Sequence, residues 1–210
     1  MLYHKIKTMW KRDPETKHKT LLEGQWQTPE FEALRKLDWI WTEKVDGTNV
    51  RVIYDGDIRD GDIRFGGRTE NAQMHSGLVN YLKSTFFPET FAEVFGSGNV
   101  TLFGEGFGAK IQKGGGNYRR DQGFVLFDVM VGDWWLRRED VEDVAEKLRI
   151  PVVPVVGTGP LNEMADYVRA GPLSTWGNFP SEGVVARPPV ELSARGGARI
   201  ITKLKTKDFR

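Results

Sequence analysis

The segment from Glu43 to Asn49 (Glu-Lys-Val-Asp-Gly-Thr-Asn) holds the residue types that covalent catalysis by an amine requires. It places Lys44 among two acids and a glycine, directly after an apolar, strand-like run. A lysine is a nucleophile only when it is neutral, and at its ordinary pKa of about 10.4 roughly one molecule in 2,500 is neutral at pH 7. A lysine held at a rigid strand end, among groups that tune its charge, is therefore a candidate nucleophile. The alternative is a surface turn in which Lys44 pairs with an acid.

Two more acids stand at expected strand ends further along the chain. Glu105 shares one face of a strand with Phe103 and Phe107. Because a carboxylate is costly to bury without a partner, Glu105 either lies at the solvent boundary, accepts hydrogen bonds from a ribose, or holds a cation. Glu182 opens an apolar strand, before a glycine that allows close backbone approach. Its carboxylate suits a hard divalent ion.

The last strand-like segment carries two lysines. Lys203 and Lys205 alternate with apolar or small residues, so they share one strand face about 7 Å apart. Two ammonium groups this close repel each other, which favours an anion such as a triphosphate between them. The alternative is a polar edge strand, where lysines are common. Phe127 lies in an apolar strand and belongs either to the core or to a platform on which a purine stacks.

Taken in order, these segments resemble the covalent nucleotidyltransferase superfamily of ATP-dependent ligases and mRNA-capping enzymes. The resemblance spans residues 43–205 and is closest to the RNA ligase 2-like group. Lys44 to Asn49 is similar to the adenylation motif that contains the lysine nucleophile. DNA ligases and capping enzymes usually carry arginine at the position of Asn49, so the Gly-Thr-Asn run favours RNA over DNA.

The resemblance implies a role for each candidate residue. Lys44, Lys203 and Lys205 are the catalytic residues, with the last two contacting phosphates. Glu43 recognises the exocyclic amine of adenine, Glu105 the ribose, and Phe127 stacks on the base. Asp46 points toward the ribose or a metal-bound water, and Glu182 places the metal. The implied nucleotide-binding residues are Glu43, Asp46, Gly47, Asn49, Arg68, Glu105, Phe127 and Glu182; Arg68 is similar to an arginine that contacts the nucleic acid.

The reaction that the resemblance implies transfers one adenylyl group three times. Lys44 takes AMP from ATP with Mg²⁺ or Mn²⁺ as cofactor, passes it to the 5′-phosphate of an RNA, and a 3′-hydroxyl then expels it. The expected partner is RNA with 5′-phosphate and 3′-hydroxyl ends. Two alternatives stay open: DNA ligation or guanylyl transfer by the same chemistry, and a non-catalytic nucleic-acid-binding domain of this fold.

The elements that position these residues predict an α+β fold, the nucleotidyltransferase domain of the DNA/RNA ligase and capping type, with two antiparallel sheets and flanking helices. We expect one adenylyltransferase domain over residues 1–210, without an oligonucleotide-binding fold or other C-terminal domain. Turn signals include Asp60-Gly61-Asp62. The predicted strands are 39–44, 49–55, 100–107, 123–131, 151–156, 182–187 and 199–205. The predicted helices are 29–37, 77–84, 88–95, 138–149 and 161–169.

Composition limits the class of protein further. The absence of cysteine excludes disulfides, cysteine catalysis and thiolate metal sites, and a net charge of +1 means that any nucleic-acid site is a local basic patch. The three histidines form no ligand cluster along the sequence. No apolar run approaches the length of a membrane span. We therefore expect an intracellular monomer, of cellular, viral or phage origin, that has no membrane partner.

Overall fold

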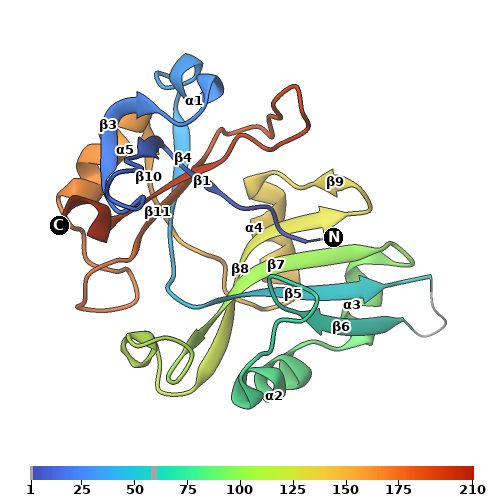
Figure 1. Ribbon diagram of the computed structural model, residues 1–210. Coiled ribbons are helices and arrows are strands. Elements are labelled where there is room, and N and C mark those ends of the chain that lie inside the picture. The colour runs from blue at the N-terminus through green and yellow to red at the C-terminus, as the bar shows by residue number, and fades with distance from the viewer. Residues whose placement is uncertain (1, 58–60) are drawn as a thin grey trace. The chain divides into compact units, whose positions relative to one another are not determined.

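The computed structural model describes residues 2–57 and 61–210. The backbone packs as two units. The first, here called the Glu105 unit, consists of Met1–Tyr3 and Asp46–Val153; the second, the Lys44 unit, consists of His4–Val45 and Pro154–Arg210. Each unit contains a five-stranded sheet (Figure 1). The α+β architecture is as predicted, whereas the single adenylyltransferase domain over residues 1–210 stays a prediction.

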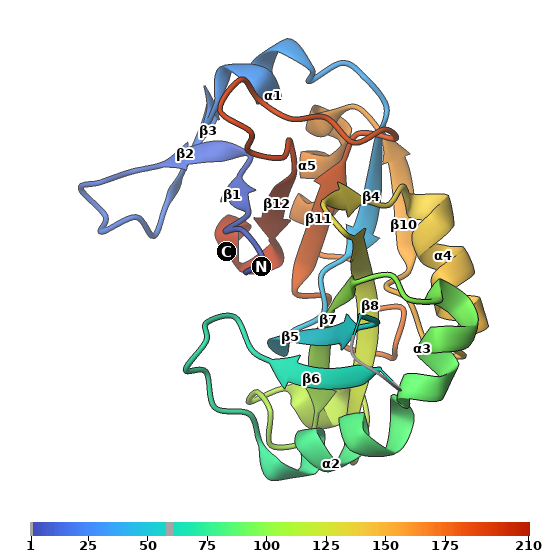
Figure 2. The same ribbon diagram turned by 90° about the vertical axis from the view of Figure 1, so that its right-hand side faces the viewer.

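The Glu105 unit is built on an antiparallel sheet with the strand order β6-β5-β7-β8-β9. Helices lie along one face of this sheet, with α2 and α3 next to each other (Figure 2). The elements of the unit are β5 (Thr48–Asp55), β6 (Asp62–Gly66), α2 (Ser76–Thr85), α3 (Pro88–Phe95), β7 (Val100–Gly108), the 3₁₀ turn η1 (Gly115–Asn117), β8 (Gln122–Val131), β9 (Trp134–Trp135) and α4 (Arg138–Lys147).

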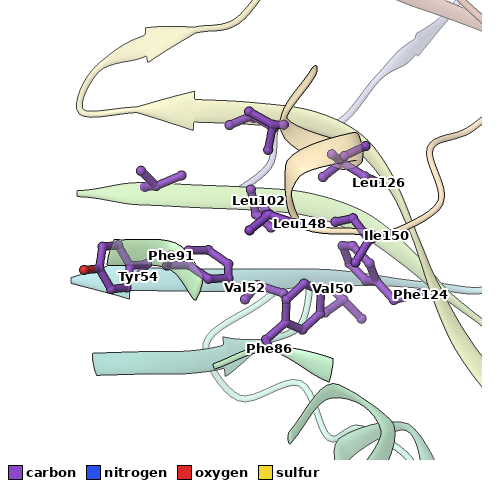
Figure 3. Close-up of a cluster of buried hydrophobic side chains, with 14 of the residues drawn as sticks. Val50, Val52, Tyr54, Phe86, Phe91, Leu102, Phe124, Leu126, Leu148 and Ile150 are labelled. Carbon is purple, nitrogen blue, oxygen red and sulfur yellow. The ribbon is translucent and has the colours of Figure 1, made fainter. Parts of the chain in front are cut away.

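The core of the Glu105 unit follows from two periodicities. Alternation along β5 buries Val50, Val52 and Tyr54 on the helix-covered face (Figure 3). The helical period of α4 directs Val141 and Val144 into the same cluster, while its opposite face is charged. The other face of the sheet is therefore left for the residues with candidate chemistry.

The Lys44 unit has a sheet with the strand order β1-β12-β11-β4-β10. All its pairs are antiparallel except β1 with β12, which is parallel. A small second sheet is formed by the antiparallel pair β2-β3, for which the sequence predicted no strands (Figure 2). The elements are β1 (Lys7–Thr8), β2 (Trp10–Arg12), β3 (Leu21–Trp26), α1 (Pro29–Ala33), β4 (Trp39–Glu43), β10 (Val155–Gly159), α5 (Leu161–Arg169), β11 (Gly183–Arg187), β12 (Thr202–Lys205) and the 3₁₀ turn η2 (Thr206–Phe209).

The predicted buried strand over 151–156 is wrong. Residues 151–153 form two backbone hydrogen bonds with Leu126 of β8, and Pro154, which has no N–H group, follows them. The strand β10 begins only at Val155 and pairs with β4 in the other unit, with most of its residues partly or fully exposed. Helix α1 is also shorter than predicted, and the turn expected at Asp60 begins outside the described residues.

The longest helices of the described chain, α2 and α4, have ten residues each. None of the helices within residues 2–57 and 61–210 has the length and apolar character needed to cross a bilayer.

Candidate active site

Lys44 directly follows β4, the strand that lies between β11 and β10 in the sheet. Alternating tryptophans anchor this strand, because Trp39 and Trp41 are buried in the core of the unit. The backbone N–H of Lys44 donates to the carbonyl of Gly183, which fixes the position of the lysine beside β11. Its side chain is 20% exposed, and Nζ lies 2.6 Å from Oε2 of Glu182. The candidate nucleophile is thus held on the sheet and paired with an acid.

Glu182 joins two lysines. While Oε2 contacts Lys44, its Oε1 lies 2.7 Å from Nζ of Lys205. The register explains the second contact: Gly183 pairs with Lys205 between β11 and β12, which places Glu182 next to that lysine. Gly183 has φ of +152°, and a Cβ atom there would come within 2.1 Å of the carbonyl oxygen of Leu204. Only glycine permits this approach of the two strands.

Lys203 lies on the same face of β12 as Lys205. The burial pattern alternates along the strand, with Thr202 and Leu204 fully buried and the two lysines partly exposed, as the sequence predicts. Lys44, Glu182 and Lys205 therefore form a group, here called the lysine–glutamate triad, that lies beside a third ammonium-bearing residue on the same sheet.

The two lysines of the triad act on the pKa of its acid, Glu182. Burial by itself raises the pKa of Glu182, but the charges and hydrogen bonds of Lys44 and Lys205 outweigh burial and hold the pKa below its ordinary value of 4.5. Glu182 is therefore ionised near neutral pH. One carboxylate between two ammonium groups leaves a net charge of +1, and this surplus attracts an anion.

Glu43, at the end of β4, is 2% exposed and has different partners. Its Oε1 accepts a hydrogen bond from the Ser174 hydroxyl at 2.5 Å. Its Oε2 accepts from the N–H and the hydroxyl of Thr175, at 2.8 and 2.6 Å. Burial, and then the charge of Glu43, raise the pKa of the Tyr167 hydroxyl. The carboxylate is thus buried with neutral donors and with no lysine among its hydrogen-bond partners in the described chain.

In the Glu105 unit, a loop holds the turn that follows the candidate nucleophile. The N–H of Asp46 donates to the hydroxyl of Tyr118, and the side-chain amide of Gln112 donates to the carbonyl of Gly47. A Cβ on Gly47 would lie 2.2 Å from the carbonyl oxygen of Gly106, so this turn also requires glycine. The Asp46-Gly47 turn is consequently fixed from two sides within its own unit.

Asn49 and Glu105 lie opposite each other in the β5–β7 register. Antiparallel partners of this kind bring their side chains to the same face of the sheet. Oδ1 of Asn49 is buried, and it accepts no hydrogen bond from the residues that the structure describes. A buried acceptor without a donor is costly, which makes this atom suited to a ligand.

Phe127 occupies a bulge in β8. The β7–β8 register passes from Gly104 opposite Leu126 directly to Phe103 opposite Asp128, so Phe127 is the extra residue. Its ring is partly buried and meets the ring of Tyr3 edge to face, with centroids 5.0 Å apart. The bulge turns this side chain away from the alternation of the strand and leaves part of the ring exposed.

A family model described as RNA ligase matches residues 37–205, most of the chain. The chain belongs to the RNA ligase family. None of the curated proteins that we compared with it matches.

Solved structures support the fold. An apo variant of the Naegleria gruberi RNA ligase matches with a TM-score of 0.67 and 20% identity, over 86% of this chain and 52% of that one. A variant of the same ligase with ATP and Mn matches equally well, over 86% of this chain and 54% of the other. A third, with AMP and Mn, matches at 18% identity over 95% and 56%. The present chain thus spans about half the length of the Naegleria gruberi ligase chains that it matches.

Arg68 is the remaining residue that the sequence suggested for the site. Its side chain is exposed, in the bend after β6. The arginine built into the same region is Arg51, which is 2% exposed, donates to the carbonyl of Gly67 and contacts Glu70 at 3.2 Å. Arg51 was not singled out from the sequence. It supports the bend from which Arg68 projects.

The donor set for a metal is small. No three histidine, aspartate or glutamate side chains gather into a metal site within the described residues. Glu182 supplies one carboxylate, whose two oxygens both contact lysines. Mg²⁺ in proteins is commonly bound by one or two carboxylates together with substrate phosphates and water. Glu182 fits an ion that enters with a phosphate ligand and does not fit one held by protein atoms alone.

Sequence reasoning missed three residues that hold the candidates in place, which are Ser174, Thr175 and Gln112. Each lies in a loop, where local sequence gives no periodicity that would indicate a long-range partner. Within each unit the structure brings candidates together: the lysine–glutamate triad in one, and Asn49 with Glu105 on a sheet in the other.

Proposed function

We propose that this chain is an ATP-dependent RNA ligase that forms a lysyl-AMP intermediate on Lys44. The observation that carries the proposal is the lysine–glutamate triad, in which a candidate nucleophile and a second ammonium share one carboxylate. The positive surplus of the triad suits a triphosphate. Membership in the RNA ligase family supports the reaction class, and a ligase with the same fold has been solved with ATP and Mn.

The first step joins Lys44 to AMP. Neutral Nζ of Lys44 attacks the α-phosphorus of ATP, the bond from that phosphorus to the bridging oxygen breaks, and pyrophosphate leaves. The nitrogen then loses a proton to solvent and remains bonded to AMP as a phosphoramidate. Phosphoryl chemistry of this kind depends on positioning and on neutralising the phosphate charge.

Lys44 must leave its ion pair before it attacks, because an ammonium group held by a carboxylate has no free electron pair. Glu182 retains Lys205 as a partner when Lys44 departs. The positive charges of Lys203 and Lys205 disfavour a third ammonium nearby and neutralise the phosphates during transfer. Mg²⁺ or Mn²⁺, bound through phosphate oxygens and Glu182, would add positive charge at the same place.

The nucleoside contacts follow the resemblance. In the proposal Glu43 accepts from the exocyclic amine of adenine, Glu105 accepts from the ribose, and Phe127 stacks on the base. Asp46, Gly47, Asn49 and Arg68 complete the nucleotide-binding set. The partly exposed ring of Phe127 and the unsatisfied oxygen of Asn49 support contacts with a ligand.

The later steps act on RNA. AMP passes from Lys44 to a 5′-phosphate, and a 3′-hydroxyl attacks that activated end and releases AMP. The proposed partner is RNA with these two ends, and the proposed active species is a monomer.

The first step can be tested by incubating the protein with α-³²P-labelled ATP and Mg²⁺ and separating the products on a denaturing gel. We expect label on the wild type and on Lys36→Ala, which removes an exposed lysine three residues after the end of α1. We expect no label on Lys44→Ala. Equal labelling of Lys44→Ala would refute the lysyl-AMP proposal.

The acceptor is tested separately with a 5′-phosphorylated nick in RNA or in DNA. We expect joining of RNA to be faster. Equal or faster joining of DNA would overturn the RNA assignment, which rests on Asn49, and would leave the adenylylation of Lys44 untouched.

A further inference from the structure

The loop between α5 and β11 folds onto Glu43. Two backbone hydrogen bonds close it, from Ser174 to the carbonyl of Phe179 at 2.8 Å and from Ser181 to the carbonyl of Pro172 at 3.0 Å. Leu173 and Pro180 form an isolated bridge between its two arms. The loop is therefore a closed turn of defined shape, here called the 172–181 loop, and it lies in the same unit as Glu43.

Ser174 and Thr175 direct three donors at one carboxylate. The Ser174 oxygen accepts the N–H of Trp176 at 3.1 Å, so its own proton is left to point at Oε1 of Glu43. Thr175 supplies its N–H and its hydroxyl to Oε2. An ionised carboxylate has about four lone-pair sites. With three of them occupied, one acceptor site remains, on Oε1.

We propose that Ser174 and Thr175 are positioning residues that set the nucleobase specificity of adenylylation by fixing the carboxylate of Glu43. This inference rests on the proposed function. A carboxylate held in this way accepts one N–H, which is what the exocyclic amine of adenine offers. The corresponding oxygen of guanine is an acceptor, and it is repelled by an acceptor-only group.

The hydrogen bonds from Ser174 and Thr175 matter more for the Glu43 carboxylate than for the 172–181 loop. Thr175 is exposed, and its hydroxyl and N–H have water available as an alternative partner. Glu43 is 2% exposed and depends on donors from the protein. Fixed orientation of a buried acceptor is what discrimination between two bases requires.

The test compares labelling with α-³²P ATP and GTP in Thr175→Val, which keeps the shape and loses the hydroxyl, and in Thr175→Ser, which restores it. We expect the ATP-to-GTP ratio of kcat/KM to fall roughly tenfold in Thr175→Val, since a hydrogen bond to a charged group is lost, and to return in Thr175→Ser. Most of the change should lie in KM for ATP. Ser174→Ala should act in the same direction.

Asn178→Ala is the matched control, because Asn178 is an exposed residue of the same loop and none of the contacts to Glu43 comes from it. Its ratio should equal that of the wild type. In a Glu43→Gln background, Thr175→Val should cause no further loss of discrimination.

Each outcome decides the proposal. A ratio unchanged in Thr175→Val, in protein that melts at the wild-type temperature, overturns it. A lower KM for ATP in Thr175→Val also overturns it, because the loop would then compete with the base for Glu43. If the wild type itself takes no label from ATP, the proposed function fails first, and the two failures are thereby distinguished.

Discussion

Two carboxylates of the Lys44 unit, Glu43 at the end of β4 and Glu182 directly before β11, are stabilised by opposite kinds of partner. Glu43 pairs in register with Val184, two residues from Glu182. Glu43 is surrounded by hydroxyl and N–H donors, whereas Glu182 is held by the ammonium groups of two lysines. The same side chain is thus placed in two different electrostatic settings a few residues apart.

The difference in partners separates recognition from chemistry. Neutral donors orient a carboxylate and leave its charge in place, so Glu43 keeps the ability to accept from a ligand. Ammonium groups offset the charge of a carboxylate, so the charge of Glu182 is coupled to Lys44 and Lys205. We therefore expect changes at Glu43 to alter the choice of nucleotide and changes at Glu182 to alter the rate of transfer.

The largest expected effect comes from Glu182→Gln. The substitution removes the carboxylate that would hold the metal ion together with the phosphates, and we expect the rate of Lys44 labelling to fall on the order of a hundredfold, at an unchanged preference for ATP over GTP. The matched change Glu43→Gln should reduce that preference and lower the rate less. Single-turnover labelling with ATP and with GTP measures the rate and the nucleotide preference of each variant. Identical behaviour of Glu182→Gln and Glu43→Gln would contradict separate roles for the two acids.

Gly183→Ala tests the close approach of β11 and β12 beside Glu182, and we expect it to destabilise the fold. A Cβ at φ of +152° meets the carbonyl oxygen of Leu204, so β11 and β12 must move apart beside Glu182. We expect a loss of roughly 1–3 kcal/mol in the free energy of unfolding, measured with urea. Gly196→Ala, at a position with nothing within 4 Å of the added atom, should be close to neutral. Equal stability of the two variants would contradict the close approach of these strands.

Lys205→Met should change the pH dependence of labelling. Without this ammonium, Glu182 is left to Lys44 alone, which favours the charged form of the nucleophile. We expect the midpoint of the labelling rate to move about one unit toward higher pH. The two lysines paired with Glu182 are Lys44 and Lys205. Lys203→Met leaves both pairs in place, and it should therefore shift the midpoint of the labelling rate less. A shift toward lower pH would argue against the sharing of Glu182.

The smallest expected effect is on stability in acid. Because the folded protein lowers the pKa of Glu182, this acid stabilises the fold above its ordinary value of 4.5, and that stabilisation is lost as the pH falls through the lowered pKa. The difference in unfolding free energy between wild type and Glu182→Gln should therefore narrow below pH 4.5. Urea melts at pH 7 and at successively lower pH measure it. If the difference in unfolding free energy between wild type and Glu182→Gln widened in acid, the pKa of Glu182 would be raised in the folded protein, not lowered.

Much of the local structure was predictable because short-range periodicity governs it. The helix over 138–149 and the alternation of Lys203 and Lys205 along β12 both appear as expected, since burial of one face decides each pattern. The segment 151–156 was mispredicted for the opposite reason. Its apolar residues satisfy the pattern of one strand, but Pro154 interrupts the hydrogen bonding, and the two halves pair with different sheets.

By itself, the sequence determined the family of the chain, the candidate nucleophile Lys44 and the face on which Lys203 and Lys205 lie. These features depend on residue type and on the period of a single element. Only the tertiary structure decided that Glu182 is shared by two lysines and that Ser174 and Thr175 hold Glu43. Lys44 and Glu182 are 138 positions apart in the chain, and Ser174 and Glu43 are 131 apart. Contacts over such distances arise from strand register and loop closure, which no local pattern specifies.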